Sequence, residues 1–109
     1  MTVRPLDVSV TGVFDSAGVA RVRIGPTVYG ESWRLRRMTV NTTSAADTDA
    51  KVFLNYETES RMVAGSYSGN RDFNETDMTL QTLDVLICVW TEGTPGANAS
   101  LVLQGTKER

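Results

Sequence analysis

Histidine is absent from this 109-residue chain, and cysteine occurs only once. Without histidine there can be no Ser-His-Asp triad, no Cys-His pair, no His-ligated zinc or haem, and no imidazole base near neutral pH. A single cysteine cannot form an internal disulfide or a multi-cysteine metal site. These absences exclude histidine-based and multi-cysteine chemistry. We predict that the chain is not an enzyme and has no catalytic residue, no cofactor and no metal ion; a carboxylate-based hydrolase is the remaining enzyme alternative.

The single cysteine, Cys88, lies between Ile87 and Val89 in an apolar stretch. Apolar surroundings raise the pKa of a thiol and make it unreactive. We predict that Cys88 packs in the core and does not act as a nucleophile or a ligand.

Long apolar runs and long helical patterns are also missing. The longest apolar run covers residues 85–90, far below the roughly 18 residues that a membrane helix needs. No stretch of about eleven or more residues sustains the i, i+3, i+4, i+7 spacing of an amphipathic helix. We expect no membrane partner and no substantial helix.

Lysine is scarce, with two lysines against nine arginines, and the net charge is −2. Residues 1–40 have a net charge of +3, whereas residues 41–92 have −6. Nucleic-acid binding would require a larger basic excess, so we expect no nucleic-acid partner. The asymmetry can orient copies of one protein, or it can simply place opposite charges on neighbouring strands.

Short strand patterns fill most of the chain. Apolar and polar residues alternate in short runs that are separated by turn residues, which is typical of a sandwich or barrel. The runs are residues 6–10, 19–24, 32–41, 50–56, 61–64, 78–80, 83–91 and 99–104. We predict one all-β domain over residues 1–109, an antiparallel β-sandwich of seven to eight strands with jelly-roll or Greek-key connections. An immunoglobulin-like sandwich is the alternative, although its paired cysteines are absent.

Two of these runs also predict a local feature of their strand. In residues 32–41, Trp33 and Leu35 share one parity and Met38 and Val40 the other. This change of phase at positions 36–37 predicts a β-bulge. Residues 83–91 are apolar on both parities, which predicts a central strand covered on both faces.

The sequence also predicts the conformation of the connections and of the two ends of the chain. Residues 14–18 predict a hairpin turn in which Gly18 takes a positive φ. Residues 1–5 are expected to form an extended arm, and the charged residues 105–109 a flexible tail. The polar, glycine-rich residues 65–77 are expected to form a long loop.

Oxygen-bearing side chains within that loop suggest a possible calcium ligand set. Asp72, Asn74 and Thr76 occupy alternate positions, and Asp77 follows. The glycine and the bidentate glutamate of an EF-hand are missing, and hydrogen bonds within a turn explain the same residues. The sequence leaves open whether residues 65–77 bind calcium or carbohydrate.

Aromatic residues beside arginines suit either core packing or an interface. Trp90 is expected in the core. We predict an interaction surface made of aromatic residues and strand arginines: Arg21, Arg23, Tyr29, Trp33, Arg34, Arg36 and Tyr67.

Four stretches, in this order, carry a resemblance to a known class of protein. They are VRIGP at 22–26 with GESW at 30–33, VFL at 52–54, GSYSGNRD at 65–72, and VWTEGTPGA at 89–97. Together they resemble small β-rich virion proteins of tailed phages that infect actinobacteria, over about residues 20–105. The excess of arginine over lysine agrees with a GC-rich host.

The resemblance implies a structural role in the particle and no catalytic residue. We expect a capsid decoration protein that binds and stabilises the major capsid protein lattice as a homotrimer. It would be made in the host bacterial cytoplasm and would lie on the outer capsid surface. The strand arginines would contact acidic surface on a neighbour, and residues 1–5 would add a strand to an exposed edge. A tail or tail-tip accessory protein is the alternative, as is a carbohydrate- or host-surface-binding module.

Overall fold

The computed structural model describes residues 2–66 and 70–109, which form eight strands and one short 3-10 helix. The helix, η1, spans Glu59–Arg61. The strands are β1 (Val3–Val13), β2 (Ala20–Ile24), β3 (Ser32–Thr42), β4 (Asp49–Leu54), β5 (Met62–Ser66), β6 (Arg71–Leu80), β7 (Leu86–Thr91) and β8 (Asn98–Glu108). The predicted all-β class and strand number are confirmed. No helix in the described ranges has the length and apolar character needed to cross a membrane.

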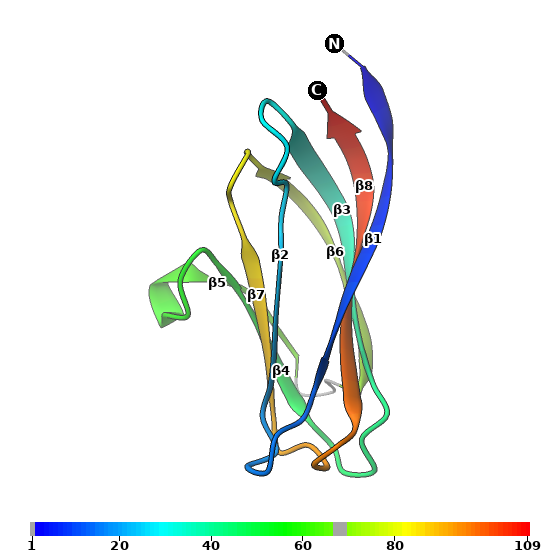
Figure 1. The fold of residues 1–109 in the computed structure, drawn as a ribbon, viewed down its shortest axis with the longest axis vertical. Coiled ribbons are helices and arrows are strands. Elements are labelled where there is room, and N and C mark those ends of the chain that lie inside the picture. The colour runs from blue at the N-terminus through cyan, green and yellow to red at the C-terminus, as the bar shows by residue number, and fades with distance from the viewer. Residues whose placement is uncertain (1, 67–69) are drawn as a thin grey trace.

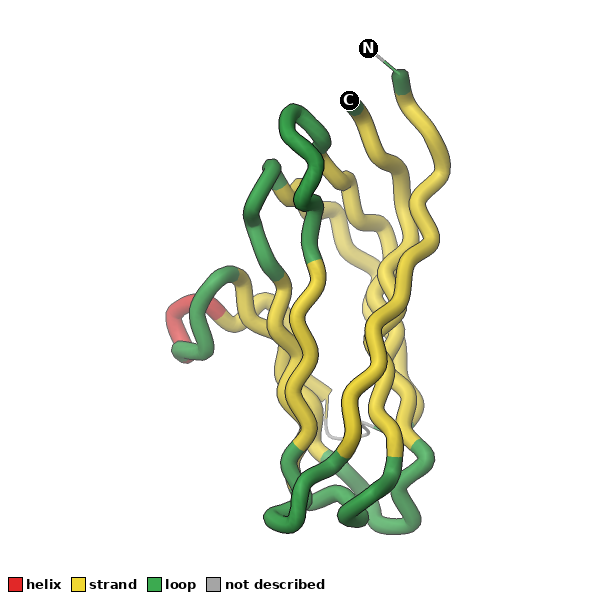
Figure 2. The backbone as a smooth tube through the Cα atoms, in the orientation of Figure 1, coloured by secondary structure: helices red, strands yellow, loops and turns green. Residues whose placement is uncertain are grey.

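The strands form two antiparallel four-stranded sheets that face each other (Figure 1). Sheet A has the order β1-β8-β3-β6, and sheet B has the order β2-β7-β4-β5. The strands of sheet A have 10 or 11 residues, and those of sheet B have 5 or 6. Loops gather at both ends of the two layers (Figure 2).

Strands from the first half of the chain pair with strands from the second half. β1 pairs with β8, β2 with β7, β3 with β6, and β4 with β5. Consecutive strands therefore lie in opposite sheets, except for the hairpin of β4 and β5. The loops that cross between the sheets bring together side chains that are distant in the sequence.

Inward-facing side chains of both sheets form one apolar core. Alternate residues of each strand point inward, as the period of a strand requires. The fully buried members include Leu35, Leu80, Leu86, Cys88, Trp90, Leu101 and Leu103. The predicted burial of Trp90 and Cys88 is confirmed, and β7 is an inner strand of its sheet, as predicted.

The predicted bulge in β3 is also confirmed. The register of β3 shifts between Leu35 and Arg37 against both β6 and β8. The shift returns Met38 and Val40 to the core side, where they are buried like Trp33 and Leu35. Gly105 of β8 faces this bulge, and a Cβ there would overlap the Arg34 carbonyl oxygen.

Several local predictions are wrong. Residues 71–77 belong to β6 and not to a loop, because β3 pairs with residues 71–75 and 78–80 on either side of the register shift. The turn at 14–18 is not a hairpin, because it connects β1 in sheet A to β2 in sheet B. Gly18 does have the predicted positive φ, at 76°.

The predicted arm and tail are also corrected. Residues 3–5 lie in β1, and residues 105–108 lie in β8. They pair with each other, with Pro5 opposite Thr106, and β8 pairs on its other side with β3. Backbone hydrogen bonding on both sides of β8 is the physical reason why the charged C-terminal residues are ordered here.

Candidate functional site

The six described residues of the predicted interaction surface do not lie on one face of the molecule. Arg21 and Arg23 project from β2 on the outer face of sheet B, opposite Val89 and Ile87 of β7. Arg34 and Arg36 lie on β3 in sheet A, on the opposite side of the molecule. Tyr29 lies in the loop between β2 and β3. Tyr67 lies outside the described residues.

Trp33 is part of the core. Its side chain is 7% exposed, and its indole N–H donates to Glu31 Oε1 at 2.7 Å. The two sheets already enclose most of the ring. Trp33 as an interface residue therefore stays a prediction, with little accessible surface on the ring to support it.

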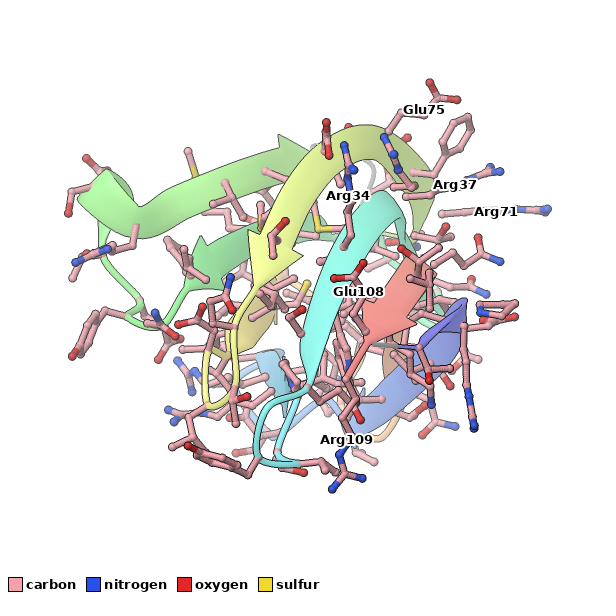
Figure 3. The ribbon with its side chains drawn as sticks, turned by 90° about the horizontal axis from the view of Figure 1, so that it is seen from above. Arg34, Arg37, Arg71, Glu75, Glu108 and Arg109 are labelled. Carbon is pink, nitrogen blue, oxygen red and sulfur yellow. The ribbon has the colours of Figure 1, made fainter. Side chains whose placement is uncertain are left out.

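Arg34 has a carboxylate partner within the chain. Its Nε and Nη2 donate to the two carboxylate oxygens of Asp77 on β6. Arg36 Nη1 lies 3.8 Å from Asp77 Oδ1. These side chains and Glu108 line an open hollow of about 440 Å³ on the outer face of sheet A, with Arg34 and Glu108 labelled in Figure 3.

Arg37 and Phe73 form a contact that sequence reasoning missed. The Arg37 guanidinium lies 3.9 Å from the centroid of the Phe73 ring, a cation–π contact between β3 and β6. Residue spacing does not reveal it, because it depends on the register that places Thr39 opposite Phe73.

Arg21 lines a groove on the outer face of sheet B. Its Nε donates to Glu57 Oε1 at 2.6 Å. The groove has a volume of about 420 Å³ and is lined by Arg21, Asp49, Lys51, Phe53, Glu57, Val89 and Thr91. It combines an apolar floor with charged groups of both signs.

Three apolar side chains are exposed together at one end of the molecule. Tyr29 is 91% exposed, Leu83 is 78% exposed, and Val28 is 40% exposed. Val28 and Tyr29 belong to the loop between β2 and β3, and Leu83 belongs to the loop between β6 and β7. We call these three residues the apolar tip. The sequence prediction included Tyr29 but placed Leu83 inside a strand.

Hydrogen bonds join the two loops of the apolar tip. The Leu83 N–H donates to the carbonyl oxygen of Pro26 at 2.9 Å. The Thr82 hydroxyl donates to the carbonyl oxygen of Glu31 at 2.8 Å. The Asp84 carboxylate accepts from the Gln81 N–H at 2.9 Å and from the Asn55 side-chain amide at 3.2 Å. The apolar side chains therefore project from a backbone with fixed geometry.

The suggested calcium ligands are spread along a strand. Asp72, Asn74 and Thr76 alternate along β6, so successive members of the set are almost 7 Å apart along the strand (about 3.4 Å per residue). Calcium ligands must surround one ion at about 2.3–2.6 Å. Among the described residues, no cluster of three acidic or cysteine side chains has the arrangement of a metal site.

Comparisons with known proteins find a weak structural similarity and no sequence match that bears on function. No protein-family model matches the sequence, and no curated protein matches it. The chain is similar to the crystal structure of Aeromonas hydrophila PliG, a periplasmic lysozyme inhibitor of g-type lysozyme. The TM-score is 0.46 and the identity 14%, covering 94% of this chain and 86% of that chain. A likeness at this level carries no argument about activity.

Proposed function

We propose that this chain is a non-enzymatic structural protein of a tailed-phage particle, a decoration protein that binds the outer surface of the capsid. The observation that carries the proposal is the strand pairing from the ends of the chain toward its middle. Each of the four pairs joins strand n to strand 9−n, and successive pairs alternate between the sheets. This order supports a jelly-roll, an arrangement of two Greek keys that viral capsid domains and lectins use.

The surface chemistry supports a protein partner. Arg21 and Arg34 on the outer faces of the two sheets already contact Glu57 and Asp77, whereas Arg23 on β2 is an exposed arginine that can form a bidentate contact with a carboxylate of a partner. A decoration protein needs many modest contacts, because copies related by the symmetry of a shell add their binding energies. In this proposal the chain acts as a homotrimer around a local threefold axis of the major capsid protein lattice.

Purified particles of the phage that encodes the chain provide the test. Mass spectrometry should find the chain in fixed proportion to the major capsid protein, and cryo-EM should place it on the outer capsid surface. Density on the tail would overturn the capsid assignment and support the tail-accessory alternative. Absence from the particle would overturn the virion role. Light scattering of the free chain at several concentrations would test the trimer.

The groove on sheet B favours a second candidate, a carbohydrate-binding module. Its charged rim of Arg21, Asp49, Lys51 and Glu57 offers hydrogen-bonding groups around the apolar floor. Polar groups around an apolar floor are the usual composition of small-ligand sites. This candidate would be supported if the chain bound a glycan on an array, Asp49→Asn lost that binding and Asp77→Asn kept it. No binding of the wild-type chain to any glycan would exclude the candidate.

A further inference from the structure

Leu83 occupies a backbone position that does not favour leucine. It is the third residue of the turn 81–84, in which the Asp84 N–H donates to the carbonyl oxygen of Gln81 at 3.0 Å. Its φ is +72°, in the left-handed region where a Cβ is strained and where glycine or asparagine is normally found. Leu83 gains little burial in exchange for this strain, because it is 78% exposed.

The other strained positions in the described chain carry polar residues. Asn55 and Glu92 are the remaining non-glycine residues with positive φ, at 66° and 65°. Asparagine tolerates this conformation well, and Asn55 also uses its side chain to accept the Val85 N–H at 2.8 Å. Leu83 is therefore the one apolar side chain among the described residues that is both strained and exposed. Residues in such conformations gather at binding sites, where the fixed geometry has a use.

Positive charge lies beside the apolar tip. Arg4, Lys107 and Arg109 line a hollow of about 240 Å³ together with Glu31, two residues after Tyr29, and Glu108, which leaves one net positive charge among these five side chains. None of these three cations forms an ion pair with a carboxylate in the part of the chain that the structure describes. In Figure 3, which views this end, Arg109 lies next to the loop between β2 and β3. A partner that contacts the tip would meet this charge as well.

We propose that the apolar tip docks into an apolar pocket with an acidic rim on a folded protein. Val28, Tyr29 and Leu83 fill the pocket, and Arg4, Lys107 and Arg109 face its rim. A folded partner fits better than a lipid bilayer, because a fluid surface gains nothing from a strained side chain held in fixed geometry. The inference rests on the proposed function, in which the folded partner is the major capsid protein lattice.

The test is binding of the purified chain to capsids assembled without it. Leu83→Asn and Tyr29→Ser should each weaken binding by about tenfold or more, as expected for exposed anchors that fill a pocket. Leu83→Asn should at the same time keep or raise Tm, by up to about 4 °C, because asparagine relieves the strain. Opposite changes in affinity and stability cannot arise from misfolding.

Glu92→Asn is the matched control. It makes the same kind of change at another left-handed position, just after β7 and at the other end of that strand from Leu83. It should leave the affinity within about twofold of wild type. Equal loss of binding in this control would overturn the assignment to the tip.

The remaining outcomes separate this inference from the proposed function. If wild-type chain does not bind the capsids, the proposed function fails and the inference fails with it. If wild type binds and both tip variants bind equally well, the decoration role stands and the tip inference is wrong. If Leu83→Asn or Tyr29→Ser converts an oligomer to a monomer in light scattering, a second copy occupies the tip, which also overturns the inference. The inference would also be overturned if the wild-type chain bound phosphatidylserine vesicles and the tip variants did not.

Discussion

Arg34 and Asp77 form a two-point ion pair across β3 and β6, with Nε to Oδ1 at 3.0 Å and Nη2 to Oδ2 at 3.2 Å. Both side chains are more than half exposed, at 52% and 60%. Hydrogen bonds from Arg34 stabilise the carboxylate and hold the pKa of Asp77 below its ordinary value. The arginine that the sequence assigned to a neighbouring molecule is thus paired within the chain.

The pKa of Asp77 should rise when Arg34 is removed. We expect Arg34→Gln to return the pKa toward its ordinary value, and Arg36→Gln to raise it less, because Arg36 acts only through its charge at longer range. NMR titration of the Asp77 carboxyl carbon measures this. Arg37→Gln is the control, since Arg37 stacks on Phe73. An unchanged pKa in Arg34→Gln would contradict the pairing.

The same pair sets a pH dependence with a defined sign. Because the pKa of Asp77 is lowered in the folded state, its stabilising contribution is complete above the ordinary carboxyl pKa. The contribution is lost as the pH falls through the lowered value. Solvent and salt screen an exposed pair, so we expect a small effect that shrinks further as salt is raised. Comparison of urea midpoints for wild type and Asp77→Asn between pH 2 and pH 7 would show it.

Gly93 should be much less tolerant of substitution than Gly96. An added Cβ at Gly93 would overlap the Phe14 ring, which is buried and has no room to move. Gly93→Ala should therefore lower the free energy of unfolding by about 2–3 kcal/mol. Gly96→Ala has open space around the new Cβ but a φ of +86°, so only the conformational strain of about 1 kcal/mol applies. Equal losses in urea unfolding would contradict the packing of Phe14 against Gly93.

Cys88 should be unreactive in the folded protein. The thiol is fully buried, and burial raises its pKa far above the ordinary value, so almost no thiolate forms at neutral pH. We expect no labelling by a thiol reagent in native buffer and complete labelling in urea. Cys88→Ala should cost about 1 kcal/mol, and Cys88→Ser about 1–3 kcal/mol because it buries a hydroxyl without a partner. Rapid labelling of the native chain would contradict the core position.

Local patterns predicted the parts of the fold that depend on local packing. The bulge in β3 was readable because Trp33 and Leu35 must face the same core as Met38 and Val40. Residues 78–80 of β6 were predicted as a strand, but residues 71–77 were missed because β6 is an edge strand whose inward parity carries Asp72, Asn74 and Thr76 there. Because this part of β6 has little core to cover, its sequence lacks the alternation of apolar and polar residues that identifies a strand.

The candidate site was less predictable than the fold, because its geometry depends on distant contacts. Leu83 was assigned to a strand by its apolar character. Its turn is held by Asp84, which Asn55 contacts from 29 positions away. Arg34 and Asp77 are 43 positions apart and meet only through the pairing of β3 with β6. Neither relationship leaves a signal in the spacing of residues.

Asn70 should be essential for the connection between β3 and β4. Its Oδ1 accepts from the Thr48 N–H at 2.8 Å and from the Thr48 hydroxyl at 2.5 Å, and its Nδ2 donates to the carbonyl oxygen of Ala46 at 2.9 Å. Thr48 is 2% exposed, so removal of the Asn70 side chain leaves buried donors without a partner. Asn70→Ala should lower the free energy of unfolding by about 2–4 kcal/mol.

A double-mutant cycle can separate this hydrogen bonding from general damage at position 70. Thr48→Val removes the buried hydroxyl, so it should cost clearly less in the Asn70→Ala background than in wild type, with a coupling of about 1 kcal/mol. Asn74→Ala is the control for an exposed asparagine and should change the free energy of unfolding by less than about 0.5 kcal/mol. Full additivity of Thr48→Val and Asn70→Ala would mean that Asn70 stabilises the loop without its bond to the Thr48 hydroxyl.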